Sequence, residues 1–110
     1  MYHNLGINRA FLVGRIEEDA LWAVSKEGEE ILRFSLITTE LYLKNGEKVI
    51  HTEQHKIAIP KRITQTGKTL FLKGLLISIE GKIQTNSRFD SANVKRYEVE
   101  ILATKYKCLL

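Results

Sequence analysis

The sequence predicts an all-β domain, a small five-stranded barrel with one helix between the third and fourth strands. Two observations support this prediction. Apolar and polar residues alternate along several short segments, as they do in strands that bury one face. Only the stretch from Lys61 to Lys73 changes to helical spacing, with Ile63, Leu70 and Phe71 as its apolar positions. Because 110 residues suffice for one compact domain, we expect residues 1–110 to form a single domain.

The first half of the chain supplies the early strands. Phe11 to Ile16 is a β-prone run, which ends at three acidic residues. Leu21 to Val24 is a candidate short strand, closed by the turn from Ser25 to Gly28. Glu30 to Leu43 predicts a longer strand with partial alternation.

The clearest turn signal is the pair Asn45 and Gly46, because both residues tolerate the positive φ of a type I′ hairpin. The strand that follows it is predicted from Lys48 to Ile59. Pro60 ends this strand, since proline has no N–H to donate to a neighbour.

The second half of the chain predicts two strands. Leu75 to Ile83 alternates strictly, a polar loop is expected from Thr85 to Val94, and alternation resumes around Tyr97 and Ile101. Three strands, a helix and two further strands, apart from the short candidate at Leu21, follow the order of the OB-fold. That fold is a five-stranded Greek-key barrel.

Composition narrows the class of function. The net charge of +4 suits an anionic partner, although charge alone does not identify one. Cys108 is the single cysteine, so an intrachain disulfide is excluded and a Cys/His zinc site is not expected. No nucleophile lies near a base in a recognisable motif and no apolar run reaches the length of a membrane span. We therefore expect no enzyme, cofactor, metal or membrane partner.

Three segments together resemble one family: Asn8 to Ile16, Thr52 to Ala58 and Lys73 to Ile83. In order and spacing they are similar to the bacterial and mitochondrial single-stranded DNA-binding proteins, and the similarity extends from about Asn8 to Leu109. The resemblance implies an OB-fold that binds single-stranded DNA independently of sequence, protecting it in replication, recombination and repair. It also implies a homotetramer, with a dimer as the alternative.

The resemblance also assigns residues to roles. The binding surface would be the sheet face bordered by the Lys44–Lys48 hairpin and the Thr85–Val94 loop. Tyr42 and Phe89 would stack on bases. His55, Asn8 and Phe11 would lie at the oligomer interface. The side chains expected to neutralise phosphates are Arg33, Lys44, Lys48, Lys56, Arg62, Lys73 and Arg88.

This chain departs from the family where the family reads DNA. Gln54, Pro60 and Arg88 stand where aromatic residues are usual, so we expect weaker and more salt-sensitive binding. Three positions that are often basic in the family carry neutral residues in this chain: Gln84, Asn86 and Ser87. The apolar end at Leu110 carries no acidic tail for recruiting replication and repair proteins; a trimmed chain and a naturally tailless relative both remain open.

Two other functions stay open from the sequence. One is a primosomal PriB-like assembly factor of replication restart, usually a dimer. The other is an OB-fold that has lost its DNA surface and serves as a protein-interaction module. The expected location is the bacterial cytoplasm, near the nucleoid, with the mitochondrial matrix as the alternative.

Overall fold

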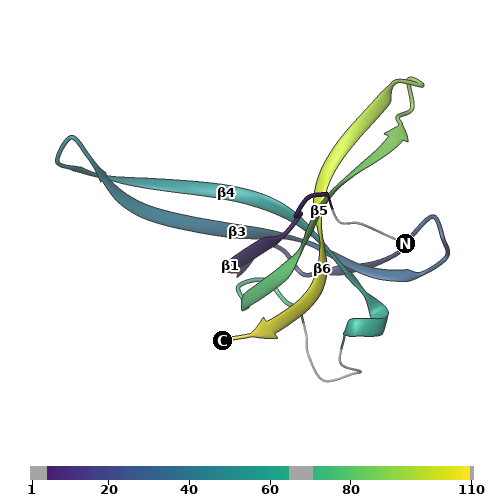
Figure 1. Cartoon of the computed structure of the whole chain (residues 1–110), viewed down its shortest axis with the longest axis horizontal. Helices are drawn as coiled ribbons and strands as arrows, with labels where there is room; N and C mark the ends of the chain where they lie inside the picture. The colour runs from purple at the N-terminus through teal and green to yellow at the C-terminus, as the bar shows by residue number, and fades with distance from the viewer. Residues whose placement is uncertain (1–4, 65–70, 110) are drawn as a thin grey trace.

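The computed structural model describes residues 5–64 and 71–109, and within them six strands form one continuous sheet (Figure 1). Their bounds are β1 Ala10–Ile16, β2 Leu21–Val24, β3 Glu30–Lys44, β4 Glu47–Pro60, β5 Leu76–Phe89 and β6 Lys95–Cys108. A single 3-10 turn, η1 Lys61–Ile63, follows β4. Within these described residues, no helix is long and apolar enough to cross a membrane.

The sheet closes on itself through β1. The strand order is β1-β5-β6-β4-β3-β2, and β1 also pairs with β3 through Arg15 and Ile16. Five strands therefore complete the ring, and β2 is an extra strand along the outer edge of β3. The predicted five-stranded OB-fold barrel is confirmed.

The core consists mainly of branched aliphatic side chains that point into this ring. Ile16 on β1, Leu36 on β3 and Ile57 on β4 are almost fully buried. Ile77 and Ile79 on β5 close the same cluster. Burial of each such side chain contributes about 1.5–3 kcal/mol, so this alternating pattern fixes which strand face turns inward.

Aromatic rings cap the core next to the segment that precedes β5. Phe71 packs between Phe34, at a centroid distance of 6.1 Å, and Tyr106, at 5.4 Å. The Phe71 carbonyl accepts a 2.9 Å hydrogen bond from the Ala20 N–H, and the Lys73 N–H donates to the Asp19 carboxylate at 2.8 Å. These contacts fix the segment to the chain between β1 and β2.

Two hairpin arms extend away from the barrel (Figure 1). The β3–β4 arm turns at Asn45 and Gly46, whose φ values of 54° and 81° confirm the predicted Asn-Gly hairpin. The β5–β6 arm turns at Asp90, whose carboxylate accepts the N–H groups of Ala92 and Val94. Both arms carry side chains far beyond the core.

Two predicted elements need correction. The loop expected over residues 85–94 is wrong, because β5 continues to Phe89 and pairs with β6, leaving only a short turn. The sequence of this part of β5 lacks the apolar alternation that predicts a strand, because neither face of the arm is buried in the core. The helix expected from Lys61 to Lys73 is a 3-10 turn in its first part, and Phe71 to Lys73 are not helical. Residues 65–70 of that prediction lie outside the described residues.

Two glycines permit close approaches between strands. A Cβ on Gly14 would lie 2.3 Å from the Ile37 carbonyl oxygen, where β1 turns onto β3. A Cβ on Gly81 would lie 2.2 Å from the Leu102 carbonyl oxygen, beside a register shift between Glu80 and Gly81. Backbone atoms cannot swing away from such contacts as a flexible side chain can.

We expect Gly81→Ala to lower the free energy of unfolding by about 1–3 kcal/mol, because the added methyl group must displace the β6 backbone. Chemical denaturation followed by circular dichroism measures the change. Gly6→Ala is the matched control, since no atom of the described residues lies within 4 Å of its Cβ, and should change stability by no more than about 0.5 kcal/mol. Equal stability of the two variants would contradict the close approach.

Candidate nucleic-acid interface

A groove of about 400 Å³ lies between the β2–β3 turn, one face of the barrel and the base of the β5–β6 arm. Three of the predicted cationic residues line it: Arg33 from β3, Arg62 from η1 and Arg88 from β5. They are distant in sequence, and barrel closure brings them together. Pro60, at a family aromatic position, is buried and also lines this groove.

Strand register decides which side chains of the β5–β6 arm share a face. Gln84 is opposite Glu100, Asn86 is opposite Glu98, and Arg88 is opposite Arg96. Directly opposed residues project to the same side of a sheet. This polar face of the arm therefore forms one wall of the groove, which Gln84, Asn86, Arg88, Glu98 and Glu100 all line.

The groove carries equal numbers of charges of the two signs. Of the described residues, four basic side chains and four carboxylates line it. Arg33 lies 3.7 Å from Glu100, Arg88 lies 3.2 Å from Glu98, and Arg62 pairs with Glu29. The phosphate-binding candidates in the groove are thus already paired with carboxylates of the chain.

Glu98 joins two of the predicted cations. Its carboxylate accepts hydrogen bonds from Arg88 at 3.2 Å and from Lys56 at 3.4 Å. The hydrogen bond from Arg88, followed by the charge of Lys56, holds the pKa of Glu98 below its ordinary value. Glu98 is therefore ionised at neutral pH and competes with any phosphate for both cations.

Glu100 is the site residue that sequence reasoning missed. It is only 7% exposed, and it accepts a hydrogen bond from Gln84 Nε2 at 2.8 Å and another from Asn86 Nδ2. In the sequence it alternates with apolar residues, like an exposed strand residue. Only the pairing register of β5 and β6, which the sequence did not reveal, places two amides opposite it.

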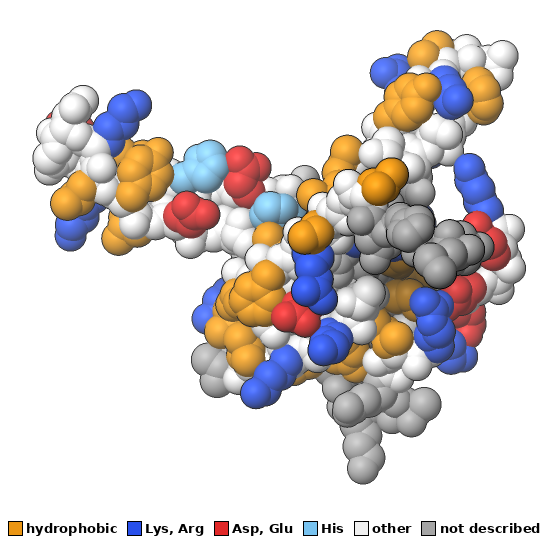
Figure 2. Space-filling view, viewed as in Figure 1, with side chains coloured by type: hydrophobic (Ala, Val, Ile, Leu, Met, Phe, Trp, Pro, Cys, Tyr) orange, Lys and Arg blue, Asp and Glu red, His pale blue; other side chains and the backbone are white. Residues whose placement is uncertain are grey.

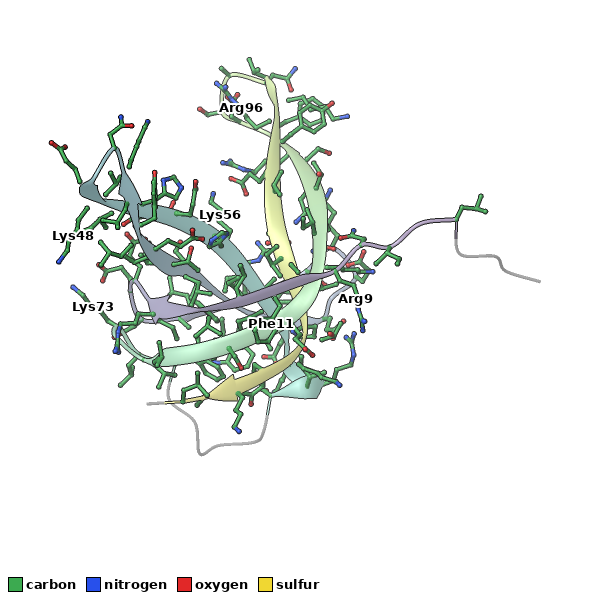
Figure 3. The ribbon with its side chains drawn as sticks, turned by 60° about the vertical axis from the view of Figure 1, so that its left-hand side comes forward. Arg9, Phe11, Lys48, Lys56, Lys73 and Arg96 are labelled. Atoms are coloured by element: carbon green, nitrogen blue, oxygen red, sulfur yellow. The ribbon has the colours of Figure 1, made fainter. Side chains whose placement is uncertain are left out.

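The predicted residues of the β3–β4 arm lie apart from the groove. Tyr42 is 44% exposed and opposite Val49, whereas Lys48 is opposite Leu43. Figure 3 shows Lys48 toward the end of this arm and Lys56 closer to the barrel. Within the described residues, Lys44 and Lys48 form no ion pair. The space-filling view in Figure 2 likewise shows basic side chains at the arm tips as well as over the barrel.

The remaining predicted DNA-binding residues are also dispersed. Phe89 ends β5 with its side chain 65% exposed, opposite Lys95 and on the other face of the arm from Arg88. Lys73 lies before β5 and is 3.9 Å from Glu18. The structure therefore brings Arg33, Arg62 and Arg88 together, with Lys56 next to them through Glu98, and leaves the others separate.

Gln54, the main departure at a family stacking position, binds within the chain. Its Nε2 donates to a Glu17 carboxylate oxygen at 2.6 Å. The amide thus holds the end of β1 against β4.

Within the described residues, no group of three or more His, Cys, Asp or Glu side chains could hold a metal ion.

The three residues predicted at an oligomer interface differ in what they contact. Phe11 is 64% exposed on β1. Asn8 exchanges two hydrogen bonds with the Ile83 backbone, at 2.7 and 2.9 Å, and so extends the β1–β5 ladder. The His55 ring lies 2.9 Å from the Thr38 hydroxyl. Phe11 is thus available for another chain, whereas Asn8 and His55 have partners within this one.

We expect Arg88→Ala to raise the pKa of Glu98 toward the ordinary glutamate value, because it removes the largest stabilising contact of the carboxylate. Lys56→Ala should also raise it, because Lys56 contributes both its charge and a hydrogen bond. A carboxyl-carbon NMR titration measures both shifts. Lys82→Ala is the control, and an unchanged Glu98 titration in Arg88→Ala would contradict the pairing.

Comparison with known proteins places the chain in a family. The Single-strand binding protein family matches residues 7–109. Two single-stranded DNA-binding proteins of Neisseria meningitidis, from a serogroup A and a serogroup B strain, are each 28% identical to the chain over 106 residues. Those alignments cover 96% of this chain but 61% of each relative, so the chain spans about three fifths of their length.

Solved structures share the fold. A single-stranded DNA-binding protein of Plasmodium falciparum, determined in complex with single-stranded DNA, superposes with a TM-score of 0.76 at 18% identity, covering 98% of this chain and 99% of that one. A deletion mutant of the Thermus aquaticus single-stranded DNA-binding protein gives 0.78 at 23% identity, covering 96% of this chain and 51% of that one.

Proposed function

Because the chain belongs to the single-strand binding protein family, we propose that it binds single-stranded DNA of any sequence, without catalysing a reaction. The observation that carries this proposal is the convergence of Arg33, Arg62 and Arg88 in one groove. The groove lies between the β2–β3 turn and the β5–β6 arm, where OB-folds bind oligonucleotides. Related chains that are single-stranded DNA-binding proteins support the same assignment.

Binding would proceed by exchange of partners. A phosphate entering the groove takes the place of Glu98 beside Arg88 and Lys56, and of Glu29 beside Arg62. Exposed ion pairs of this kind contribute about 0–1 kcal/mol each, so the exchange is accessible at ambient temperature. The arms extend the path of the strand beyond the groove, and Tyr42 and Phe89 offer rings for stacking.

The biological role that follows is protection of exposed single strands during replication, recombination and repair. A protein with this role must accept every base. Phosphate contacts and stacking meet that need, since neither depends on base identity.

We expect fluorescence polarisation with a labelled mixed-sequence oligonucleotide to detect binding at low salt, and Glu98→Gln to bind roughly fivefold tighter. The substitution removes a competing anion and frees both Arg88 and Lys56. Glu27→Gln is the matched control, because Glu27 lines the groove without an ion pair in the described residues.

Two results would count against the proposal. Absence of binding at low salt would overturn the function itself. Equal affinities for wild type, Glu98→Gln and Glu27→Gln would show that the strand does not use the groove.

We further propose that the protein acts as a homotetramer assembled in part through β1. Among the residues that the structure describes, Ala10 to Gly14 of β1 pair with β5 alone, and only Arg15 and Ile16 reach β3. The other edge of β1 is thus open beside Phe11, which is exposed, and Val13, which is 43% exposed. An open strand edge flanked by apolar side chains is a template for pairing with a second chain.

We expect light scattering to give a mass of about four chains, and Phe11→Glu to shift the mass toward smaller species, because it places a charge on the proposed contact. Leu21→Lys is the control, since Leu21 is exposed on β2, which pairs with β3 at Arg33 and not with β1. A stable dimer in the wild type would instead favour a PriB-like assembly factor. An unchanged mass in Phe11→Glu would remove β1 from the interface.

A further inference from the structure

The floor of the groove holds two amide side chains in a fixed orientation. One carboxylate oxygen of Glu100, Oε1, accepts hydrogen bonds from both Gln84 Nε2 and Asn86 Nδ2. Gln84 and Asn86 therefore both turn their nitrogen atoms toward it, and Arg33 approaches the same oxygen. A reversed amide would place its oxygen against the carboxylate, which electrostatic repulsion disfavours.

This orientation turns the amide oxygens away from Glu100. Both side chains line the groove, and within the described residues neither oxygen accepts a hydrogen bond. Each amide also keeps one N–H that Glu100 does not require. Gln84 and Asn86 thus present a carbonyl oxygen beside an N–H, the pattern that pairs with base edges.

A fixed amide distinguishes bases that a freely rotating amide cannot. Cytosine and thymine present opposite hydrogen-bonding patterns at C4 and N3. Cytosine has an amino donor on C4 and an acceptor at N3, whereas thymine has a carbonyl acceptor on C4 and an N–H donor at N3. An unrestrained amide matches either pattern by turning over. Because Glu100 prevents this rotation, one pattern is favoured at each amide.

The carboxylates of the groove determine which base edge is favoured, the one with an amino group or the one with a carbonyl group. Glu98 lies next to Asn86 on the same face of the arm, and Glu29 borders the groove from the β2–β3 side. Both are acceptors, and once phosphates engage Arg88 and Arg62 these oxygens become available to the bases. An exocyclic amino group can donate to them, whereas the carbonyl of thymine is repelled.

We propose that Gln84 and Asn86, held by the buried Glu100, give the protein a preference for bases with an exocyclic amino group over thymine. The inference rests on the proposed function and adds a graded base preference to it. Every base still binds through phosphate contacts and stacking. The preference comes from hydrogen bonds to base edges. Stacking on aromatic side chains does not supply such hydrogen bonds and accepts every base.

The test compares two oligonucleotides that differ only at the group in question. A homopolymer of 5-methyl-deoxycytidine and one of deoxythymidine have the same ring size and methyl group, so stacking is matched. We expect the wild-type protein to bind the methylcytidine strand about fivefold more tightly at neutral pH, as measured by fluorescence polarisation. Equal affinities would overturn the inference and leave the proposed function intact, whereas absence of binding to both would overturn both.

Variants identify the residues responsible. In Glu100→Gln the neighbouring amides can turn over, so the ratio of the two affinities should fall toward one while binding persists. Asn86→Ala should lower the ratio without removing a buried group. Gln54→Ala is the matched control, because that amide binds Glu17 outside the groove, and its ratio should equal that of the wild type.

Thermal unfolding monitors the fold of each variant. If Glu100→Gln fails to fold, Asn86→Ala alone decides the outcome. A wild-type ratio preserved in Asn86→Ala would overturn the assignment.

Discussion

The one-residue register shift between Glu80 and Gly81 determines what the groove contains. Below the shift, Ile79 is opposite Tyr106, and above it Gly81 is opposite Ala103. Continued without the shift, the lower register would place Gln84 opposite Ile101 in place of Glu100. A one-residue slip moves every side chain to the other face of a strand, so the polar wall of the groove depends on this irregularity.

The same irregularity explains why a carboxylate can be buried there. An isolated buried charge is strongly unfavourable, and Glu100 is stabilised by two amide donors and a nearby guanidinium. Within the described residues, no buried side-chain nitrogen or oxygen lacks a hydrogen-bond partner. The base of the β5–β6 arm is therefore held by directional polar contacts in place of apolar packing, which fixes side-chain orientation more strictly than it adds stability.

The sequence predicted the parts of the fold that local physics determines. The Asn45-Gly46 turn and the alternating apolar residues of β5 up to Ile83 were visible in it, because positive φ and core burial leave clear patterns. The continuation of β5 to Phe89 left no such pattern, since that arm packs on no core. The predicted helix failed where Phe71 is fixed by tertiary contacts with Ala20 and Tyr106.

The site was predictable to a lesser degree for a related reason. Similarity to a family predicts which positions of the chain bind DNA. It does not predict which side chains of the same chain contact them. Arg33, Arg62 and Arg88 do converge, yet their pairing with Glu100, Glu29 and Glu98 depends on register and loop geometry. Tyr42 and Phe89 lie on separate arms, so they cannot form one stacking platform with the groove residues of a single chain.

Cationic side chains that lack a carboxylate partner in the described residues lie on the β3–β4 arm, whereas those of the groove are paired with carboxylates. The arm and the groove would therefore contribute to DNA binding in different ways. Lys44 and Lys48 have no carboxylate partner in the described residues, so they attract phosphate without first losing an ion pair. The groove has balanced charges and gains little from long-range attraction. Affinity there must come from short-range contacts with the bases and from exchange of ion-pair partners. A strand captured electrostatically by the arms would thus be held in the groove by contacts that depend on base chemistry, which is where Gln84 and Asn86 act.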